Sequence, residues 1–213
     1  NLTWRCQLHC DYCWLPHVPI DRAAVAYTAR TWERAISPYL ERPSVVDVSG
    51  GEPFLYPQLP ELLHLLASRG HYWALTTNGL HKAAIERFCR SRPQNGLVIH
   101  VSDHAGNVAA NENARLLVAA GYHVNVNRVD HQAAGNHLPG GALLPYQDWA
   151  GGDALDGISR LCDAGQYHWF ADPTGEVWRC SVWMQVGRPS MGNLFTGTFT
   201  PTKGLLPCDT GCS

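Results

Sequence analysis

Three cysteines stand close together near the start of the chain. Cys6, Cys10 and Cys13 have the spacing C-x3-C-x2-C and follow a short apolar run at residues 2–4. A structural zinc site takes four ligands, so three thiolates leave one coordination position for a further group. On zinc that position would hold a catalytic water, or it would be filled by His9, which lies in the same loop. On an iron–sulfur cluster it would leave one iron open to a small molecule.

A second group of four cysteines lies towards the end of the chain: Cys162, Cys180, Cys208 and Cys212. A turn signal, Asp-Pro-Thr-Gly at residues 172–175, stands between the first two of them. We expect a hairpin with strands at residues 170–171 and 177–178, which brings Cys162 and Cys180 together. Four thiolates satisfy either one cubane iron–sulfur cluster or one zinc ion, and a pair of disulfides is the third interpretation.

The composition narrows the classes of protein to which the chain can belong. Its 213 residues are enough for one domain, or one domain with a small appendage, around a sizeable core. Hydrophobic residues make up 45% and charged residues 16%, which argues against disorder. A net charge of −2 argues against a protein that binds nucleic acid, and no apolar run approaches the roughly 20 residues of a membrane span.

The start of the chain lacks the apolar core of a secretion signal, so we expect a cytoplasmic protein. Thiols stay reduced in that compartment, and a chain of this length folds without disulfides. The two cysteine groups are therefore expected to bind metal rather than to pair. Cys89 stands alone in a predicted helix, and we expect it to be a small apolar residue.

Apolar strands and amphipathic helices alternate along the first 130 residues. The patterns predict helices over residues 23–36, 59–68, 82–91 and 111–120. They predict buried strands over residues 2–4, 44–48, 72–77, 97–101 and 122–126. Such alternation is typical of an α/β protein with a parallel sheet and right-handed crossovers.

Polar or glycine-rich residues follow the last four predicted strands, at positions 49–52, 76–79, 102–103 and 127–128. Parallel α/β folds build their sites at the carboxyl ends of the strands. We therefore expect these four groups to gather at one edge of the sheet. His104, next to the end of a strand, is a candidate to line the same pocket.

The character of the chain changes after residue 130. Residues 131–160 are rich in glycine, proline and alanine and show weak periodicity, so we expect a connecting segment there. Aromatic residues, turn signals and the second cysteine group follow from residue 161 onward. We place a boundary near residue 150, with one domain over residues 1–150 and a small cysteine-rich domain over residues 151–213.

Three motifs in order along the chain resemble the radical S-adenosylmethionine (SAM) superfamily. The first is the C-x3-C-x2-C loop, with Tyr12 just before its third cysteine. The run SGGEP at residues 49–53 matches the family's Gly-Gly-Glu-Pro motif, and TNG at residues 77–79 follows the next strand. The resemblance implies a partial (β/α) TIM-like barrel of about five to six parallel strands. Five strands are visible, so either a sixth lies near residues 142–144 or the sheet is unusually short.

The resemblance also implies a cofactor site. Cys6, Cys10 and Cys13 would bind three irons of a 4Fe–4S cluster, whose fourth iron binds the amino and carboxylate groups of SAM. The backbone of Tyr12 would meet the adenine. The amino group of SAM would contact the segment of Gly50, Gly51, Glu52 and Pro53. The ribose would contact Ser102 and Asp103, and the methionine carboxylate would contact Arg128. Asn78 would also contact the cofactor.

Several of these residues also have a plain structural alternative. In the functional interpretation, Glu52 offers its carboxylate to an ammonium group. In the alternative, the glycine run with Pro53 simply turns the chain from a strand into a helix. Asn78 would cap or turn the end of its strand, and Asp103 would form a turn or cap a helix. Arg128 would lie on the surface or bind an acidic substrate.

The segment from Cys162 to Cys180 resembles the opening of the SPASM or twitch domains that follow some radical SAM barrels. Residues 191–195, MGNLF, match the Gly-Asn segment that comes next in that family. The resemblance implies one auxiliary 4Fe–4S cluster on all four cysteines of the second group, in a twitch-like domain or a SPASM domain cut at Ser213. The neighbouring tryptophans would shield that cluster from water: Trp169, Trp178 and Trp183.

The resemblance implies an enzyme that cleaves SAM reductively to methionine and a 5′-deoxyadenosyl radical, which takes a hydrogen atom from a substrate. The implied substrate is a ribosomally made peptide, and the alternative is a small molecule in a dehydrogenase or epimerase reaction. An external reductant of the flavodoxin or ferredoxin type would supply one electron. No nucleic acid or membrane is expected as a partner. The rival from another class is a non-catalytic zinc-binding interaction module.

Overall fold

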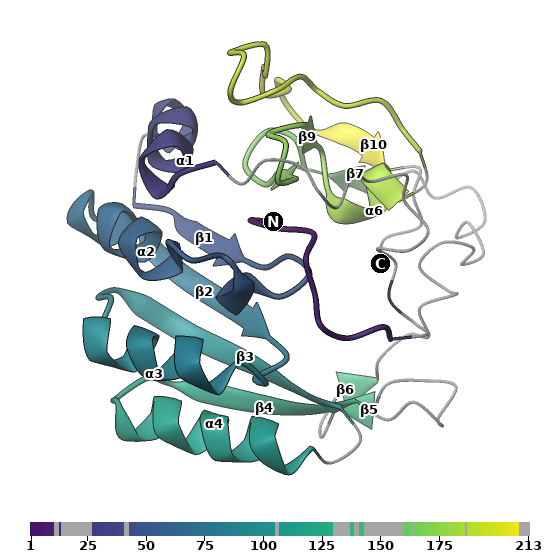
Figure 1. Ribbon diagram of the computed structural model, residues 1–213. Helices are drawn as coiled ribbons and strands as arrows, with labels where there is room; N and C mark the ends of the chain where they lie inside the picture. Colours follow the sequence, from purple (N-terminus) through teal and green to yellow (C-terminus); the bar gives the residue numbers. More distant parts are fainter. Residues whose placement is uncertain are drawn as a thin grey trace.

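The fold is described from a computed structural model, shown in Figure 1. The described residues are 1–10, 13, 27–40, 43–104, 107–129, 137–138, 141–142, 160–162, 164–185 and 187–208. A four-stranded parallel sheet lies at its centre, with the strand order β1-β2-β3-β4. The strands are β1 (Val45–Val48), β2 (Tyr72–Thr77), β3 (Gly96–His104) and β4 (Val124–Val129). Within these described ranges no helix is both long and apolar enough to cross a membrane.

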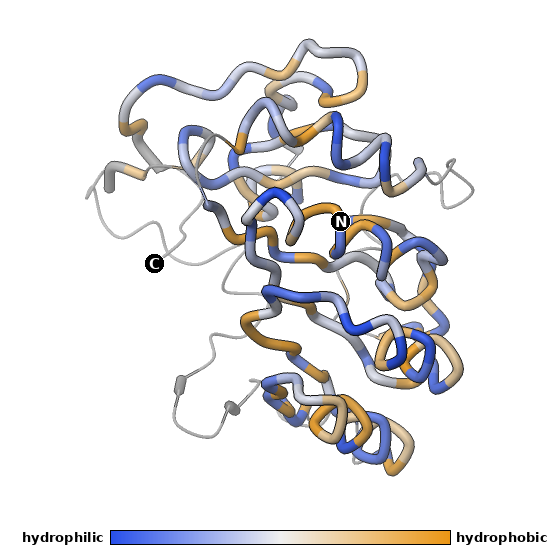
Figure 2. The backbone as a smooth tube through the Cα atoms, turned by 90° about the vertical axis from the view of Figure 1, so that its left-hand side faces the viewer, coloured by the Kyte–Doolittle hydropathy of each residue, from blue (hydrophilic) through white to orange (hydrophobic). Residues whose placement is uncertain are grey.

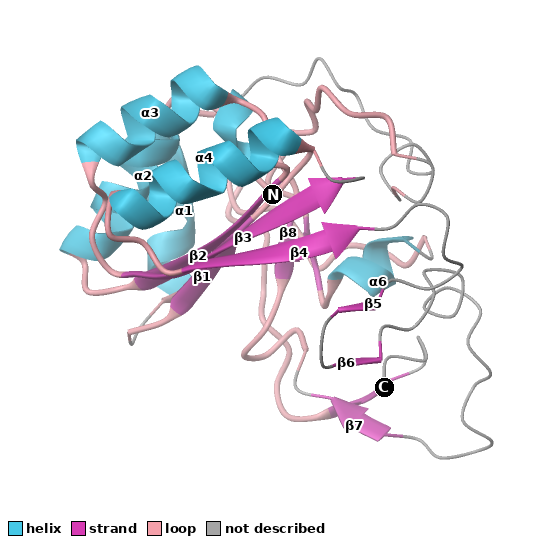
Figure 3. Ribbon diagram, turned by 90° about the horizontal axis from the view of Figure 1, so that it is seen from below, coloured by secondary structure: helices cyan, strands magenta, loops and turns pink. Residues whose placement is uncertain are grey.

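Helices cover one face of this sheet, as Figure 3 shows. They are α1 (Ala29–Ile36), α2 (Leu59–Ser68), α3 (Lys82–Ser91) and α4 (Val108–Ala119). Two short 3-10 turns, Ser37–Tyr39 and Pro53–Leu55, lie between α1 and α2 in the chain. Each strand from β1 to β3 is followed by a helix and then by its parallel neighbour, which is the predicted βα alternation.

The core forms between the helices and the sheet. One stripe of α2, formed by Leu59, Leu62, Leu63 and Leu66, is almost completely buried. Figure 2 shows that the helices carry hydrophobic and hydrophilic residues along their turns, as expected for helices with one face on a sheet. Trp73 of β2 packs edge-on against Phe88 of α3, with ring centroids 5.9 Å apart. These large side chains fix the sheet beneath the helices.

Residues 2–5 form no regular strand, although a strand is predicted at residues 2–4. They nevertheless run parallel to residues 49–51, which directly follow β1, and bond to them. The amide of Leu2 donates to the carbonyl of Ser49 at 3.0 Å, and the amide of Gly51 donates to the carbonyl of Thr3 at 2.7 Å. The spacing of these bonds is uneven, so the segment continues the sheet without forming a regular ladder.

The ends of several elements differ from the prediction. Helix α1 begins at Ala29, because the side chain of Thr28 caps it by accepting from the amide of Thr31. Helix α4 begins at Val108 rather than at residue 111, because Asn107 is its cap. Strands β3 and β4 run to His104 and Val129, so the polar residues 102–103 and 127–128 lie inside strands.

The prediction of a sixth parallel strand near residues 142–144 is wrong for the part that is described. Strand β6 (Gly141–Ala142) pairs in antiparallel fashion with β5 (His137–Leu138) and belongs to a separate two-stranded sheet. Residues 143–144 lie outside the described residues.

The later part of the chain contains short elements. These are β7 (Arg160–Cys162), β8 (Phe170–Ala171), β9 (Val177–Trp178), α6 (Ser181–Gln185) and β10 (Leu206–Cys208). The predicted hairpin is confirmed, because β8 and β9 pair in antiparallel fashion around the turn. Gly175 in this turn has φ +85°, a conformation that favours glycine.

The C-terminal part shares its apolar core with the first part. The ring of Phe195 meets the ring of Trp32 in α1 edge-on, with centroids 4.9 Å apart. Phe199 packs against both Tyr39 and Trp169, at 4.7 and 5.3 Å between centroids. The predicted boundary near residue 150 falls outside the described residues, so the division into two domains stays a prediction.

Replacing Trp32 by alanine should destabilise both parts of the molecule together. Trp32 is only 4% exposed and contacts Phe195, so the truncation leaves a cavity where α1 meets the C-terminal part. We expect a loss of about 3–5 kcal/mol in the free energy of unfolding, measured by chemical denaturation. Leu205→Ala is the control, because Leu205 is 53% exposed and should change little. Equal stability of the two variants would contradict the shared core.

Candidate functional site

The first cysteine segment lies directly against the glycine pair that follows β1. The amide of Gly51 bonds to the carbonyl of Thr3, and the amide of Glu52 bonds to the carbonyl of Arg5 at 2.8 Å. A Cβ atom added to Gly50 would lie 2.6 Å from the carbonyl oxygen of Thr3, and one added to Gly51 would overlap the carbonyl of Arg5. The two glycines therefore leave room for the backbone of residues 3–5. The sequence had suggested that they leave room for a ligand.

The carboxylate of Glu52 is fully buried and ties together two strand ends. One oxygen accepts from the amide of Phe54 at 3.0 Å and from the hydroxyl of Thr77 at 2.7 Å. The other oxygen accepts from the amide of Asn78 at 2.8 Å. Burial raises the pKa of Glu52, and these three hydrogen bonds oppose the rise. The carboxylate that was predicted to meet an ammonium group thus holds the ends of β1 and β2 together.

Pro53 opens the 3-10 turn Pro53–Leu55 and is itself buried. Glu52 is the cap of this turn. The expected turn from strand into helix is therefore present, although the helix that begins at Pro53 is a short 3-10 turn and α2 starts at Leu59.

Asn78 connects the end of β2 to the cysteine segment. Its side-chain nitrogen lies 3.7 Å from the sulfur of Cys6, in hydrogen-bonding geometry. Its side-chain oxygen accepts from the side chain of Gln7 at 3.2 Å and from the amide of Leu80 at 3.0 Å. Asn78 therefore fulfils the predicted role in the turn after its strand, because its side chain accepts from the amide of Leu80. Its predicted contact with SAM stays a prediction.

The three cysteines of the first group are half-buried and form no disulfide within the described residues. The sulfur of Cys6 accepts from the amide of Leu8 at 3.4 Å, and burial raises the pKa of the Cys6 thiol. The amide of Cys13 donates to the carbonyl of Cys10 at 3.0 Å, which closes a turn between these two residues. The sulfur of Cys10 lies 3.8 Å from Nδ1 of His104, so this histidine does face the site.

Asp103, Ser102 and Arg128 lie on neighbouring strands at the same edge of the sheet. Both carboxylate oxygens of Asp103 are engaged by the start of α4, at 2.8 Å from the amide of Asn107 and 3.0 Å from the side chain of Asn111. Asp103 is therefore neither a turn residue nor the cap of α4, which is Asn107, but its carboxylate binds residues at the start of that helix from within β3. Ser102 is half-buried, and Arg128 is exposed and stands opposite Asp103 in the β3–β4 register.

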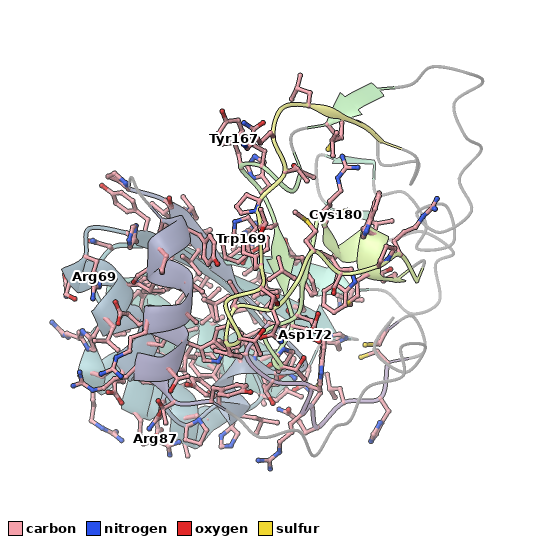
Figure 4. The ribbon with its side chains drawn as sticks, turned by 90° about the horizontal axis from the view of Figure 1, so that it is seen from above. Arg69, Arg87, Tyr167, Trp169, Asp172 and Cys180 are labelled. Carbon is pink, nitrogen blue, oxygen red and sulfur yellow. The ribbon has the colours of Figure 1, made fainter. Side chains whose placement is uncertain are left out.

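The second cysteine group is described in part. The sulfur of Cys162 accepts from the amide of Ala164, and the sulfur of Cys180 accepts from the amide of Trp183, each at 3.4 Å. Figure 4 shows Cys180 beside α6. Strand β10 pairs with β7 and thereby brings Cys208 to the strand next to that of Cys162. Cys212 lies outside the described residues, as does Tyr12 of the first group.

Sequence reasoning missed the parts played by Thr77 and Gln7. Thr77 had a readable signal, because it continues the buried alternate positions of β2 that begin with Trp73 and Leu75. Its hydroxyl therefore points to the interior, where it needs a partner. Gln7 carried no comparable signal, because its contact with Asn78 depends on how the cysteine segment folds back onto the sheet.

The donor atoms of both groups suit an iron–sulfur cluster. Thiolates are its usual ligands, and hydrogen bonds from amides to the sulfurs help to set its properties. Cys6, Cys162 and Cys180 each accept such a bond from an amide two or three residues further along the chain. Across the described residues no three side chains of histidine, cysteine, aspartate or glutamate already converge as a metal site would require.

Comparison with known proteins adds evidence that is independent of this geometry. A sequence model described as the radical SAM superfamily matches residues 1–108. The chain is 28% identical over 153 residues to a PqqA peptide cyclase of Granulibacter bethesdensis, covering 65% of this chain and 41% of that protein. It is 29% identical over 182 residues to a PqqA peptide cyclase of Streptomyces rochei, covering 79% and 48%. The chain thus spans less than half of the length of these two relatives.

Two solved structures resemble the fold. BtrN in complex with AdoMet and 2-DOIA gives a TM-score of 0.61 at 17% sequence identity, over 93% of this chain and 77% of that chain. SuiB of Streptococcus suis bound to S-adenosylmethionine gives a TM-score of 0.51 at 13% identity, over 92% and 62%. The likeness confirms the predicted α/β fold with its partial barrel.

Replacing Glu52 by glutamine should destabilise the edge of the sheet. The buried carboxylate accepts from two backbone amides on different oxygens, so an amide side chain would turn its NH2 group towards one of these donors. We expect a loss of about 1–3 kcal/mol in the free energy of unfolding, measured by chemical denaturation. Glu86→Gln is the control, because the Glu86 side chain is 42% exposed and pairs only loosely with Lys82.

The pH dependence of this difference has a definite sign. Because burial raises the pKa of Glu52 in the folded chain, the folded state keeps this proton to a higher pH than the unfolded chain does. The stability that Glu52 contributes is thus fully present below the ordinary pKa of 4.5 and declines as the pH rises through the raised value. The gap between wild type and Glu52→Gln should shrink over that range, and a gap that widens would contradict the account.

Proposed function

The chain belongs to the radical SAM superfamily, and from this premise we propose that it is an enzyme that cleaves SAM reductively and takes a hydrogen atom from a substrate. The observation that carries the proposal is the fixed position of the Cys6 segment, which lies on Gly50 and Gly51 and contacts Asn78 at the carboxyl edge of the sheet. When bound, a 4Fe–4S cluster with SAM supplies one-electron cleavage to methionine and a 5′-deoxyadenosyl radical.

The residues of this chain would bind and orient the cofactors. Cys6, Cys10 and Cys13 would hold three irons and leave the fourth for SAM. Because both oxygens of Glu52 are engaged by the protein, we assign the amino group of SAM to the carbonyl groups of Gly50 and Gly51. Glu52 then positions that backbone from within.

The hydrogen bonds of the other candidate residues decide which of them we assign to SAM. Asn78 would orient Cys6 through the contact between its side chain and the sulfur. Ser102 would meet the ribose, while Asp103 would stay with α4 because both of its oxygens are engaged there. Arg128 would offer an exposed cation to the methionine carboxylate, and the backbone of Tyr12 would meet the adenine.

We further propose a second 4Fe–4S cluster on the second cysteine group: Cys162, Cys180, Cys208 and Cys212. Support comes from the amide-to-sulfur bonds at Cys162 and Cys180 and from the pairing of β7 with β10. Four thiolates leave no open iron, so this cluster would accept or deliver an electron rather than bind the substrate. The division into a barrel over residues 1–150 and a cluster domain over residues 151–213 belongs to the same proposal.

The proposed substrate is a ribosomally made peptide. The support is the likeness to two PqqA peptide cyclases over 65% and 79% of this chain. A peptide that becomes cross-linked would lose two hydrogen atoms, one to the deoxyadenosyl radical and one as a proton and an electron. Mass spectrometry distinguishes that product from a small molecule that has been dehydrogenated or epimerised.

The enzyme would also need an electron donor and a reducing compartment. A reductant of the flavodoxin or ferredoxin type would supply the electron that cleaves SAM. The protein would work in the cytoplasm, where cysteine thiols stay reduced. A net charge of −2 gives no support for a nucleic-acid partner.

The proposal is tested on protein purified without oxygen. We expect about eight irons per chain and release of 5′-deoxyadenosine when dithionite and SAM are added. Cys6→Ala should abolish nucleoside release and leave about four irons, because it removes a ligand of the SAM-binding cluster. Cys89→Ala should change neither, since Cys89 belongs to neither cysteine group and its thiol donates to the carbonyl of Leu116 between α3 and α4.

Two results would contradict the proposal. Zinc in place of iron, with no nucleoside released, would favour the non-catalytic zinc-binding module. Nucleoside release that survives Cys6→Ala would mean that the first cysteine group does not bind the cluster that cleaves SAM.

A further inference from the structure

Arg179, next to Cys180, is a buried arginine in the second cysteine region. It is only 6% exposed. Its Nε donates to the carbonyl of Ala164 at 3.0 Å, and its Nη2 donates to the carbonyl of Leu206 at 3.5 Å. The guanidinium also lies over the ring of Trp183, 4.8 Å from the centroid. The rigid fork of an arginine suits such simultaneous contacts.

The two carbonyls belong to segments that carry the other cysteines. Ala164 lies two residues after Cys162 and donates its own amide to the Cys162 sulfur. Leu206 stands opposite Cys162 in the pairing of β7 with β10, two residues before Cys208. One side chain therefore connects the backbones that carry three of the four cysteines of the second group.

Because Arg179 is next to Cys180 and contacts residues two positions from Cys162 and Cys208, a cluster bound by these cysteines would lie near its positive charge. A 4Fe–4S cluster with four thiolates is negatively charged, and reduction adds another negative charge. A nearby cation within the protein stabilises the reduced form more than the oxidised form, because the attraction grows with the charge. Arg188 lies over the same ring of Trp183, at 5.6 Å, but it is exposed to water and therefore acts through a screened charge.

We propose that Arg179 is a positioning residue for the auxiliary cluster, an inference that rests on the proposed function of the second cysteine group. Its guanidinium holds the segments of Cys162, Cys180 and Cys208 in register. Its charge raises the reduction potential of the cluster that these segments bind.

The test compares Arg179→Gln, Arg179→Lys and the control Arg188→Gln in the full chain, prepared without oxygen. Iron per chain, the rate of iron release to a chelator, and the midpoint potential from a titration followed by electron paramagnetic resonance are the readouts. Circular dichroism on heating checks that each variant folds. Arg188→Gln should match the wild type, because the Arg188 side chain is exposed.

We expect Arg179→Gln to lose auxiliary iron, from about eight towards about four per chain, and any cluster that remains should have a more negative potential. Arg179→Lys keeps the positive charge but loses the forked guanidinium. It should therefore release iron faster than the wild type, while the midpoint potential of its auxiliary cluster stays close to that of the wild type. If Arg179→Gln does not fold, Arg179→Lys alone decides, and release at the wild-type rate overturns the positioning role. Unchanged iron and potential in both variants would overturn the inference.

The double variant Cys162→Ala/Cys180→Ala separates this inference from the function on which it rests. Loss of about four irons establishes the auxiliary cluster. If that loss occurs while both Arg179 variants keep iron and potential, only the inference about Arg179 fails. If the double variant loses no iron, the auxiliary cluster and the inference fail together.

Discussion

The cysteine segment at the start of the chain can rest on the sheet only because two glycines leave room for it. Any Cβ atom at Gly50 or Gly51 would collide with the carbonyl groups of residues 3–5. The hydrogen bonds made at this contact fix where Cys6 leaves the sheet. Glu52 then locks the same point to the end of β2 through a fully buried carboxylate. The position of the candidate site is therefore set by the packing of the backbone of residues 3–5 against Gly50 and Gly51.

In the second cysteine group, too, hydrogen bonds to the backbone position the cysteines. Amides bond to the sulfurs of Cys162 and Cys180, and Arg179 connects the segments around them. The contact of Trp32 with Phe195 joins this region to the helical layer through a continuous apolar core. A stable relative placement of the two groups is what electron transfer between two clusters would require.

Local patterns predicted the regular parts of the fold well. Helices α2 and α3 have the predicted ends, because their apolar spacing and the glycine after α2 act within a few residues. The end of β3 was missed, because polar residues such as Asp103 resemble a turn until their partners on the following helix are known. Glu52 was found by its motif, but its burial depends on Thr77 from another strand, which no local pattern reveals.

The most direct test of the account is whether SAM binds at an iron held by Cys6, Cys10 and Cys13. Electron paramagnetic resonance of the reduced Cys162→Ala/Cys180→Ala variant observes the first cluster alone. The account predicts that adding SAM changes the spectrum of this cluster, since the open iron gains new ligands. A spectrum that stays the same with saturating SAM would contradict the claim that these three cysteines leave an iron for the cofactor.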